Sequence, residues 1–343
     1  MKTQFGILAA LAVLATAFTT GCGQTASEKR VQDDLMEANK QAQNGNTKAA
    51  RDLCDRAIRL DPNAVGTFVY TPKDSQTERQ TTIADIFAGV YDDPSLVFYM
   101  SQATQKFPKE PTPWLTLAQA YQRLGRVQDQ QAAAKQAAAL LEPTITKPGG
   151  GADPNKLNTL GSAYYMAGNM PQATQTLQSA ITMYQAEPGL YNSLAYFWAD
   201  ANDTAHLTLA AQYANMAIQK AKSKMALDDD MRTETLAMYM DTLGWVQYRQ
   251  KQYPAALTSL QDAVQDIPRE PEVRYHLGMV YLALAKSPSN NLAVNPQEAA
   301  RAEFQSALAI DPTYADAQAE LNKLGSPPAT ASAGDDAGPE NLL

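Results

Sequence analysis

A short motif, Leu followed by Gly or Ala, returns along this chain at a spacing of 34 residues, and this period constrains the fold more than any single residue does. Leu160-Gly161 returns as Leu194-Ala195, and Leu243-Gly244 returns as Leu277-Gly278. A Glu-Pro dipeptide stands at the matching point ahead of three units, at Glu110-Pro111, Glu187-Pro188 and Glu270-Pro271. Such a period predicts a stack of helical units with a concave surface, which suits binding better than chemistry.

Small and turn-forming residues recur at fixed positions inside the units. In the first unit they are Ala38, Gly45, Ala50, Ala57 and Pro62. Small side chains let two helices approach closely, Gly permits the turn between them, and Pro stops a helix. The pattern resembles the tetratricopeptide repeat superfamily over nearly all of residues 31–324. The resemblance implies an all-α fold, a right-handed α-solenoid of about seven helix pairs with a C-terminal capping helix.

The units divide into two blocks on either side of a Pro- and Gly-rich linker. The N-terminal block comprises units at 31–64, 77–110, which is degenerate, and 111–144. The linker covers 145–153, and the C-terminal block comprises units at 154–187, 188–224, 237–270 and 271–314, with a cap at 315–324. Lys-Pro-Gly-Gly-Gly in the linker is the best candidate for a hinge. Residues 325–343, rich in Pro, Ala, Ser and Asp, read as a disordered tail.

The charge of the chain excludes one class of partner. Its formal net charge is -8 and its pI is about 4.9. A nucleic-acid backbone requires a basic stripe, so nucleic acid is not expected as a ligand.

The N-terminus has the features of an export signal. Lys2 gives a positive start, and the apolar run from Phe5 to Phe18 has the length of a signal-peptide core and is too short for a membrane span. The run ends at Thr19-Thr20-Gly21-Cys22, which resembles the lipobox of bacterial lipoproteins. The resemblance implies that 1–21 is a signal peptide, that Cys22 carries lipid and that 22–30 form a tether. Thr19 departs from the usual Leu, so a secreted protein without lipid is the alternative.

The resemblance to bacterial lipoproteins also implies a location. Gly23 follows the Cys where Asp would signal retention in the inner membrane of many Gram-negative bacteria. The expected location is therefore extracytoplasmic, with the chain anchored by lipid to a membrane. In a Gram-negative cell this would be the periplasmic side of the outer membrane.

In the tetratricopeptide family the first helix of each pair lines the concave groove, and its groove positions can be carried over to this chain. The resemblance gives these candidate peptide-binding residues: Gln119, Arg123, Asn155, Asn158, Ser162, Tyr165, Met166, Asn192, Tyr196, Asp241, Trp245, Tyr248, Arg249, Tyr275 and Met279. Aromatic, Met and amide side chains dominate, which suits a peptide or helix as the ligand. No groove Lys accompanies Asn155 and Asn158, so the family's clamp for an acidic C-terminus is not expected. The alternative is that many of these aromatic residues only pack between repeats.

Residues suited to catalysis or metal binding are sparse. The two histidines, His206 and His276, lie far apart in the array, and no His-Glu-x-x-His spacing occurs. His276 is expected to pack or to form a hydrogen bond. With Cys22 lipidated, Cys54 is left as a buried structural thiol. Asp228-Asp229-Asp230 lacks the EF-hand spacing and is expected to form a solvated turn and helix cap. We therefore expect neither an enzyme nor a cofactor.

These features predict a lipid-anchored extracytoplasmic scaffold that mediates protein–protein interaction in the assembly of a cell-envelope complex. Its expected partners are an envelope protein or peptide segment and, through the lipid, a membrane. Tyr165, Trp245 and Tyr275 are expected to lie on one binding surface. One alternative, by resemblance, is a pilotin-like lipoprotein for assembly of a secretin or type IV pilus. The other is an envelope protein that binds a glycan or small ligand along its aromatic groove.

Overall fold

The computed structural model describes residues 26–66, 82–146, 152–224, 229–286 and 293–325. Within these ranges the chain is helical and contains no strand. Helix pairs follow one another, closed by a single last helix: α1 (Ala26–Gln43) with α2 (Thr47–Leu60), α3 (Ile83–Ala88) with α4 (Asp93–Lys106), α5 (Pro111–Arg123) with α6 (Val127–Thr146), α7 (Pro154–Met166) with α8 (Met170–Met183), α9 (Pro188–Asp200) with α10 (Leu207–Lys224), α11 (Asp229–Arg249) with α12 (Tyr253–Asp266), α13 (Pro271–Ala285) with α14 (Pro296–Ile310), and α15 (Ala315–Leu324). A short 3-10 helix, η2 (Pro62–Val65), follows α2.

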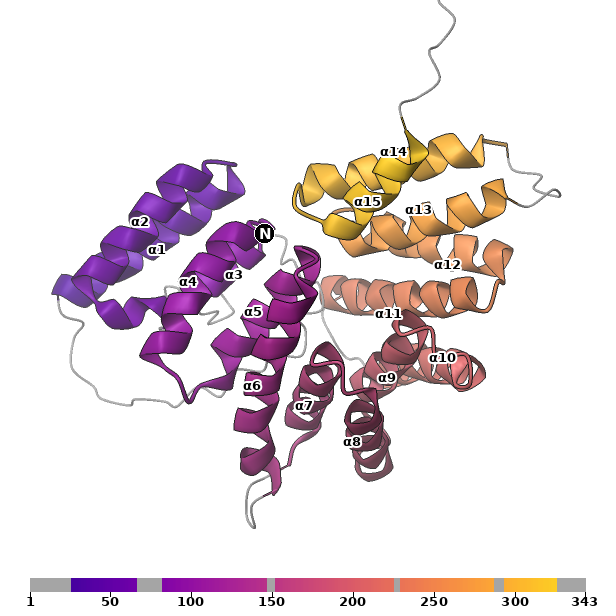
Figure 1. The fold of residues 1–343 in the computed structure, drawn as a ribbon, viewed down its shortest axis with the longest axis horizontal. Helices are drawn as coiled ribbons and strands as arrows, with labels where there is room; N and C mark the ends of the chain where they lie inside the picture. The colour runs from indigo at the N-terminus through magenta and orange to yellow at the C-terminus, as the bar shows by residue number, and fades with distance from the viewer. Residues whose placement is uncertain (1–25, 67–81, 147–151, 225–228, 287–292, 326–343) are drawn as a thin grey trace, which may run out of the picture.

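The pairs stack in chain order. From α5 onward each pair packs internally, and its second helix packs on the first helix of the next pair, as in α6 on α7 and α10 on α11. The first helices also touch one another in the order α5, α7, α9, α11 and α13, so they form the inner layer of a curved array. Figure 1 shows that the pairs follow an arc and that the end of α5 lies near α15. This arrangement confirms the expected all-α helical repeat fold.

The Gly of the recurring Leu-Gly motif marks the closest approach of the two helices in a pair. A Cβ atom added at Gly161 would lie 2.7 Å from Leu177 Cγ, and one added at Gly278 would lie 2.5 Å from Phe304 Cε1. Leu177 and Phe304 are fully buried on the second helix of their pairs. The motif therefore recurs because a large side chain of the second helix packs directly on the backbone of the first.

We expect Gly278→Ala to lower the free energy of unfolding by about 1–2 kcal/mol. Overpacking a full core costs about 1–3 kcal/mol, and Ala recovers up to about 1 kcal/mol of helix propensity. The rigid ring of Phe304 cannot turn aside, so the clash should dominate. Denaturant unfolding followed by circular dichroism measures the change. Gly189→Ala is the matched control, because its added Cβ meets only Tyr239 Oη at 3.8 Å; equal stability in the two variants would contradict the packing argument.

The recurring Pro and Gly residues mark where helices begin and where the chain turns between them. Helices α5, α9 and α13 begin at Pro111, Pro188 and Pro271, so each Glu-Pro dipeptide marks a helix start, where Pro costs no hydrogen bond. Gly168, between α7 and α8, has a φ of +76°, which favours Gly.

Three boundaries differ from the expected ones. Helix α1 begins at Ala26 and takes in the last residues of the expected tether. Helix α11 begins at Asp229, ahead of the expected unit at 237–270, and includes Asp229 and Asp230; Asp228 of the expected turn and cap lies outside the described residues. Helix α6 continues through Pro143 to Thr146, into the start of the expected linker. The signal peptide, Cys22, the linker glycines and residues 326–343 lie outside the described residues.

The hydrophobic core is continuous across the two expected blocks. One buried cluster extends from Leu35 on α1 to Val246 on α11, and α6 of the first block packs on α7 of the second. A second buried cluster joins α12, α13, α14 and α15. The two blocks therefore form one stack.

Candidate functional site

The inner face, as we define it, is the inward surface of α7, α9, α11 and α13. Equivalent positions in these helices form rows across it. Asn158, Asn192, Asp241 and Tyr275 each stand two residues before the Leu of the motif. A second row, two residues after that Leu, comprises Ser162, Tyr196, Trp245 and Met279. The repeat thus gives these eight predicted groove residues equivalent positions on successive first helices.

Hydrogen bonds between rings and carboxylates connect the helices of the inner face. Tyr165 on α7 donates its hydroxyl to Asp200 on α9, and Tyr196 on α9 donates its hydroxyl to Glu272 on α13. His276 Nδ1 on α13 lies 2.8 Å from Asp241 Oδ1 on α11. The expectation that His276 packs or forms a hydrogen bond is confirmed. These bonds fix both the aromatic rings and the acids in position.

Trp245 is enclosed by its neighbours. Its ring stacks on His276 at 4.1 Å between centroids and on Tyr248 at 4.8 Å, and the Arg249 guanidinium lies 4.5 Å above it. Only 2% of its surface is exposed. The indole ring therefore packs between α11 and α13 and adds almost no exposed area to the binding surface expected from Tyr165, Trp245 and Tyr275.

The other predicted groove residues divide by exposure. Met166 and Asp241 are buried like Trp245, because side chains of neighbouring helices cover them. Asn155 is exposed at the start of α7, and Arg123 is paired with Asp93. The remaining candidates are partly exposed: Gln119, Asn158, Ser162, Tyr165, Asn192, Tyr196, Tyr248, Arg249, Tyr275 and Met279. A ligand on this face would therefore meet mainly tyrosines and amides.

Glu272 on the inner face is hard to ionise. Burial raises the pKa of Glu272 to about 7, and the charges of Asp241 and Asp200 add to the effect, against the opposing charge of His276. The pKa of the Tyr196 hydroxyl lies well above its usual value, first through burial and then through Asp200 and Glu272. The pKa of His276 is also raised, because nearby carboxylates outweigh its burial.

Four buried polar atoms on the inner face have no hydrogen-bond partner among the described residues. Two are acceptors, the Oδ1 atoms of Asn158 and Asn192. Two are donors, Nε1 of Trp245 and Nε of Arg249. Unsatisfied buried polar groups are uncommon in folded proteins, and each requires an explanation.

A second polar group, which we name the closure cluster, joins the two ends of the arc. It consists of Tyr91, Asp93, Arg123, Glu270 and Asp311. Tyr91 donates to Glu270 Oε2 at 3.0 Å, and Arg123 Nε donates to Asp93 Oδ2 at 2.8 Å. A Cβ atom added at Gly125 would lie 2.9 Å from that of Ala315, so α5 directly meets α15. The cluster joins two early parts of the stack to two late ones. The early parts are the turn between α3 and α4 and helix α5, and the late parts are α13 and α15.

Sequence reasoning named only Arg123 from the closure cluster, and placed it in the groove. Tyr91 and Glu270 are 179 residues apart, and no period relates them. Glu270 was recognised only as part of a repeat boundary. The contact depends on the curvature of the whole stack.

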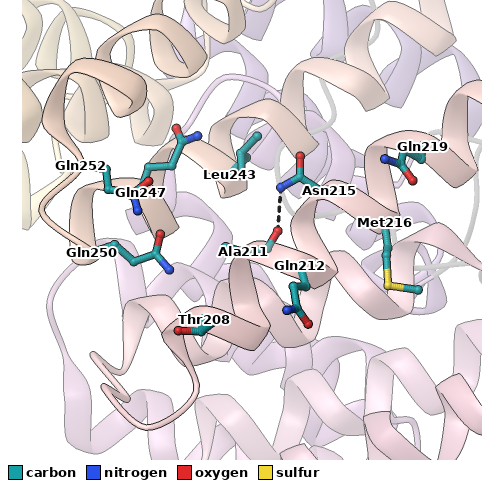
Figure 2. A pocket seen from close by; sticks show the side chains of 10 residues that line it. All are labelled: Thr208, Ala211, Gln212, Asn215, Met216, Gln219, Leu243, Gln247, Gln250 and Gln252. Carbon is teal, nitrogen blue, oxygen red and sulfur yellow. Dashed lines mark hydrogen bonds between the residues drawn. The ribbon is translucent and has the colours of Figure 1, made fainter.

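A hollow of about 640 Å³ lies on the other side of the array, between α10 and α11, with the turn before α12 at its edge. Figure 2 shows its lining, in which amide side chains predominate. Leu243 and Met216 add apolar surface, and the lining contains neither a charged side chain nor an aromatic ring. Asn215 donates to Ala211 O and Gln250 to Leu207 O, so these amides partly satisfy the protein's own backbone. The sequence reasoning did not identify this hollow.

The described residues offer little for other kinds of site. No group of three or more His, Cys, Asp or Glu residues in them could hold a metal ion. None of the described helices combines the length and apolar character that a bilayer crossing requires. Cys54 is buried, which raises the pKa of its thiol to about 12, so the expectation of a buried thiol is confirmed.

Comparison with protein-family models gives one match, to the tetratricopeptide repeat family, over residues 242–315. These residues include part of α11 and all of α12, α13 and α14. No curated protein matches the chain.

Solved structures with a similar fold share little sequence with the chain. A tetratricopeptide repeat protein from Parabacteroides merdae is 13% identical, with a TM-score of 0.49, 86% of this chain covered and 98% of that one. A thermophilic repeat protein from Thermus thermophilus is 18% identical, with a TM-score of 0.43. The match covers 63% of this chain and 98% of that one. The Cut9–Hcn1 assembly of the APC/C is 18% identical, with a TM-score of 0.43; 88% of this chain matches, and it spans 47% of the matched chain.

Proposed function

We propose that the chain is a scaffold of the tetratricopeptide repeat kind, whose inner face binds a segment of a partner protein. The observation that supports this proposal is a set of unpartnered polar atoms on the inner face, at Asn158, Asn192, Trp245 and Arg249. Two of these atoms accept and two donate, and a peptide backbone offers both a carbonyl and an N–H at every residue. Partly exposed tyrosines beside them provide contact area at little cost in side-chain entropy.

We further propose that the scaffold acts at a membrane surface outside the cytoplasm and helps to assemble a cell-envelope complex. The support is the sequence Thr19-Thr20-Gly21-Cys22 after an apolar run, with Gly23 following. Several acyl chains on Cys22 would hold the scaffold stably, at about 0.8 kcal/mol per buried CH₂. The anchor would confine the search for a partner to the membrane surface.

The anchor has a direct chemical test. We expect cells grown with labelled palmitate to incorporate label into the wild-type protein and not into Cys22→Ala. The labelled protein should sediment with membranes, and the variant should be released with the soluble fraction. Membrane association that persists without label in the wild type would argue against the lipid anchor.

Binding by the inner face is tested by affinity capture from gently solubilised envelopes with an inner variant, Asn158→Ala with Asn192→Ala. Both Oδ1 atoms lack partners in the described structure, so removing them should leave circular dichroism and the melting temperature nearly unchanged. We expect the partner captured by the wild type to be lost from this variant. The matched control is Gln212→Ala with Gln219→Ala in the outer hollow. Loss from the control and retention by the inner variant would overturn the proposal.

A further inference from the structure

The charges on the inner face do not balance. Asp200, Glu272 and Asp316 approach it from α9, α13 and α15. The cations around them are already engaged: Arg249 lies over Trp245 and donates to Asp200 O at 3.2 Å, and His276 pairs with Asp241. On α15, Lys323 Nζ lies 2.6 Å from Glu320. The face therefore carries an excess of negative charge.

The acids lie close enough to affect one another. The pKa of Asp316 is raised by burial, then by the charges of Asp200 and Glu320, with His276 and Lys323 opposing. Asp200 likewise contributes to the raised pKa of Glu272. Asp200 therefore makes ionisation of both Glu272 and Asp316 harder, and a cation placed among these acids would relieve the repulsion.

A second observation, independent of charge, also indicates a ligand at this face. Trp245 is 2% exposed, and its Nε1 has no partner among the described residues. Its ring stacks on His276, whose ring lies 6.4 Å from that of Tyr196, so the indole belongs to the same group of rings as the tyrosine that donates to Glu272. The unpartnered Oδ1 atoms of Asn158 and Asn192 lie on the two preceding first helices. These atoms fit the N–H and C=O groups of an extended chain.

Aromatic rings complete the surroundings of the excess charge. Tyr165 stacks on Phe197 at 4.2 Å, and Tyr196 stands beside the same ring at 6.2 Å. The two hydroxyls donate to Asp200 and to Glu272 respectively. A tyrosine face next to a carboxylate attracts an ammonium or guanidinium group through both its quadrupole and its neighbour's charge.

Resting on the proposed function, we propose that the inner face binds an extended peptide segment carrying Lys or Arg, with a basic side chain placed between Asp200 and Glu272. The backbone of the segment meets the amides of Asn158 and Asn192. The tyrosines cover the apolar stem of the basic side chain. An acidic segment is rejected by the same carboxylates.

Fluorescence anisotropy tests this with three labelled peptides of equal length built on a Gly/Ser/Ala frame, bearing four Lys, four Gln or four Glu. We expect the full-length protein to bind the Lys peptide at least tenfold more tightly than the Gln peptide. The Glu peptide should bind more weakly than the Gln peptide. In Asp200→Asn with Glu272→Gln the preference for Lys should fall to about twofold or less. Both replacements keep an acceptor for Tyr165 and Tyr196, so the fold should be unaffected.

The control for long-range attraction by the acidic protein is Asp262→Asn with Asp266→Asn, on exposed positions of α12. It removes the same charge and should keep the tenfold preference. Equal binding of the Lys and Gln peptides by the wild type overturns the basic specificity and leaves the scaffold proposal in place. Equal loss of preference in both double variants also overturns it, because the effect would then come from net charge. No binding of any peptide overturns the inference, and the envelope capture separately decides the scaffold function.

Discussion

Replacing Arg123 with Met is expected to lower the free energy of unfolding by roughly 3–5 kcal/mol, the cost of leaving a buried charge without its partner. Arg123 donates two hydrogen bonds to Asp93, which has no exposed surface. It also lies near Asp311, likewise unexposed, whose Oδ2 has no partner among the described residues. Met preserves most of the volume of the side chain, so the loss reports the charge and not a cavity.

Urea unfolding of the wild type, Arg123→Met and Arg126→Met provides the measurement. Arg126 pairs with Asp129 three residues later, and both side chains are about half exposed, so its replacement should cost less than about 1 kcal/mol. Asp93→Asn added to Arg123→Met should recover part of the stability, because it removes the orphaned charge. Similar stability in the two single variants would show that the closure cluster contributes little to the fold.

The period in the sequence predicted the stack because each repeated residue has a local cause. Pro111, Pro188 and Pro271 start helices, and Gly161 and Gly278 admit a large side chain from the partner helix. Such causes act within one unit, so they can be recognised without knowing the rest of the fold. Helix α15 ends the stack over the range expected for the cap.

The closure of the arc and the burial of individual side chains could not be predicted in the same way. The bond between Tyr91 and Glu270 arises only after the small rotations between successive units have accumulated along the arc. The family's position rule predicts Trp245 on the inner side of its helix. It could not show that His276 and Arg249 would cover the ring, because these neighbours differ from unit to unit. Position in a repeat therefore specifies a direction, and the neighbouring side chains decide exposure.

Raising the pH from 5 to 9 is expected to weaken the closure cluster, on the order of 4 kcal/mol at most. Burial raises the pKa of Glu270 from 4.5 to about 8; Glu272 and Asp241 add to the shift, while the hydrogen bond from Tyr91 and the charge of Arg123 oppose it. The folded protein thus holds a proton that the unfolded chain releases near pH 4.5. The resulting stability is fully present below pH 4.5 and is lost as the pH rises through about 8.

The difference between wild type and Glu270→Gln isolates this proton, since Glu272 and His276 titrate in both proteins. Gln still accepts a hydrogen bond from Tyr91 and never ionises, so the stability of the variant should fall less between pH 5 and 9. Glu298→Gln, exposed in the first turn of α14, is the matched control and should parallel the wild type. Amide hydrogen exchange should show the loss first at the turn before α4 and at the start of α13, where the cluster joins the ends of the arc. Parallel pH profiles for wild type and Glu270→Gln would mean that Glu270 is already ionised at neutral pH, and that Arg123 alone compensates the buried acids.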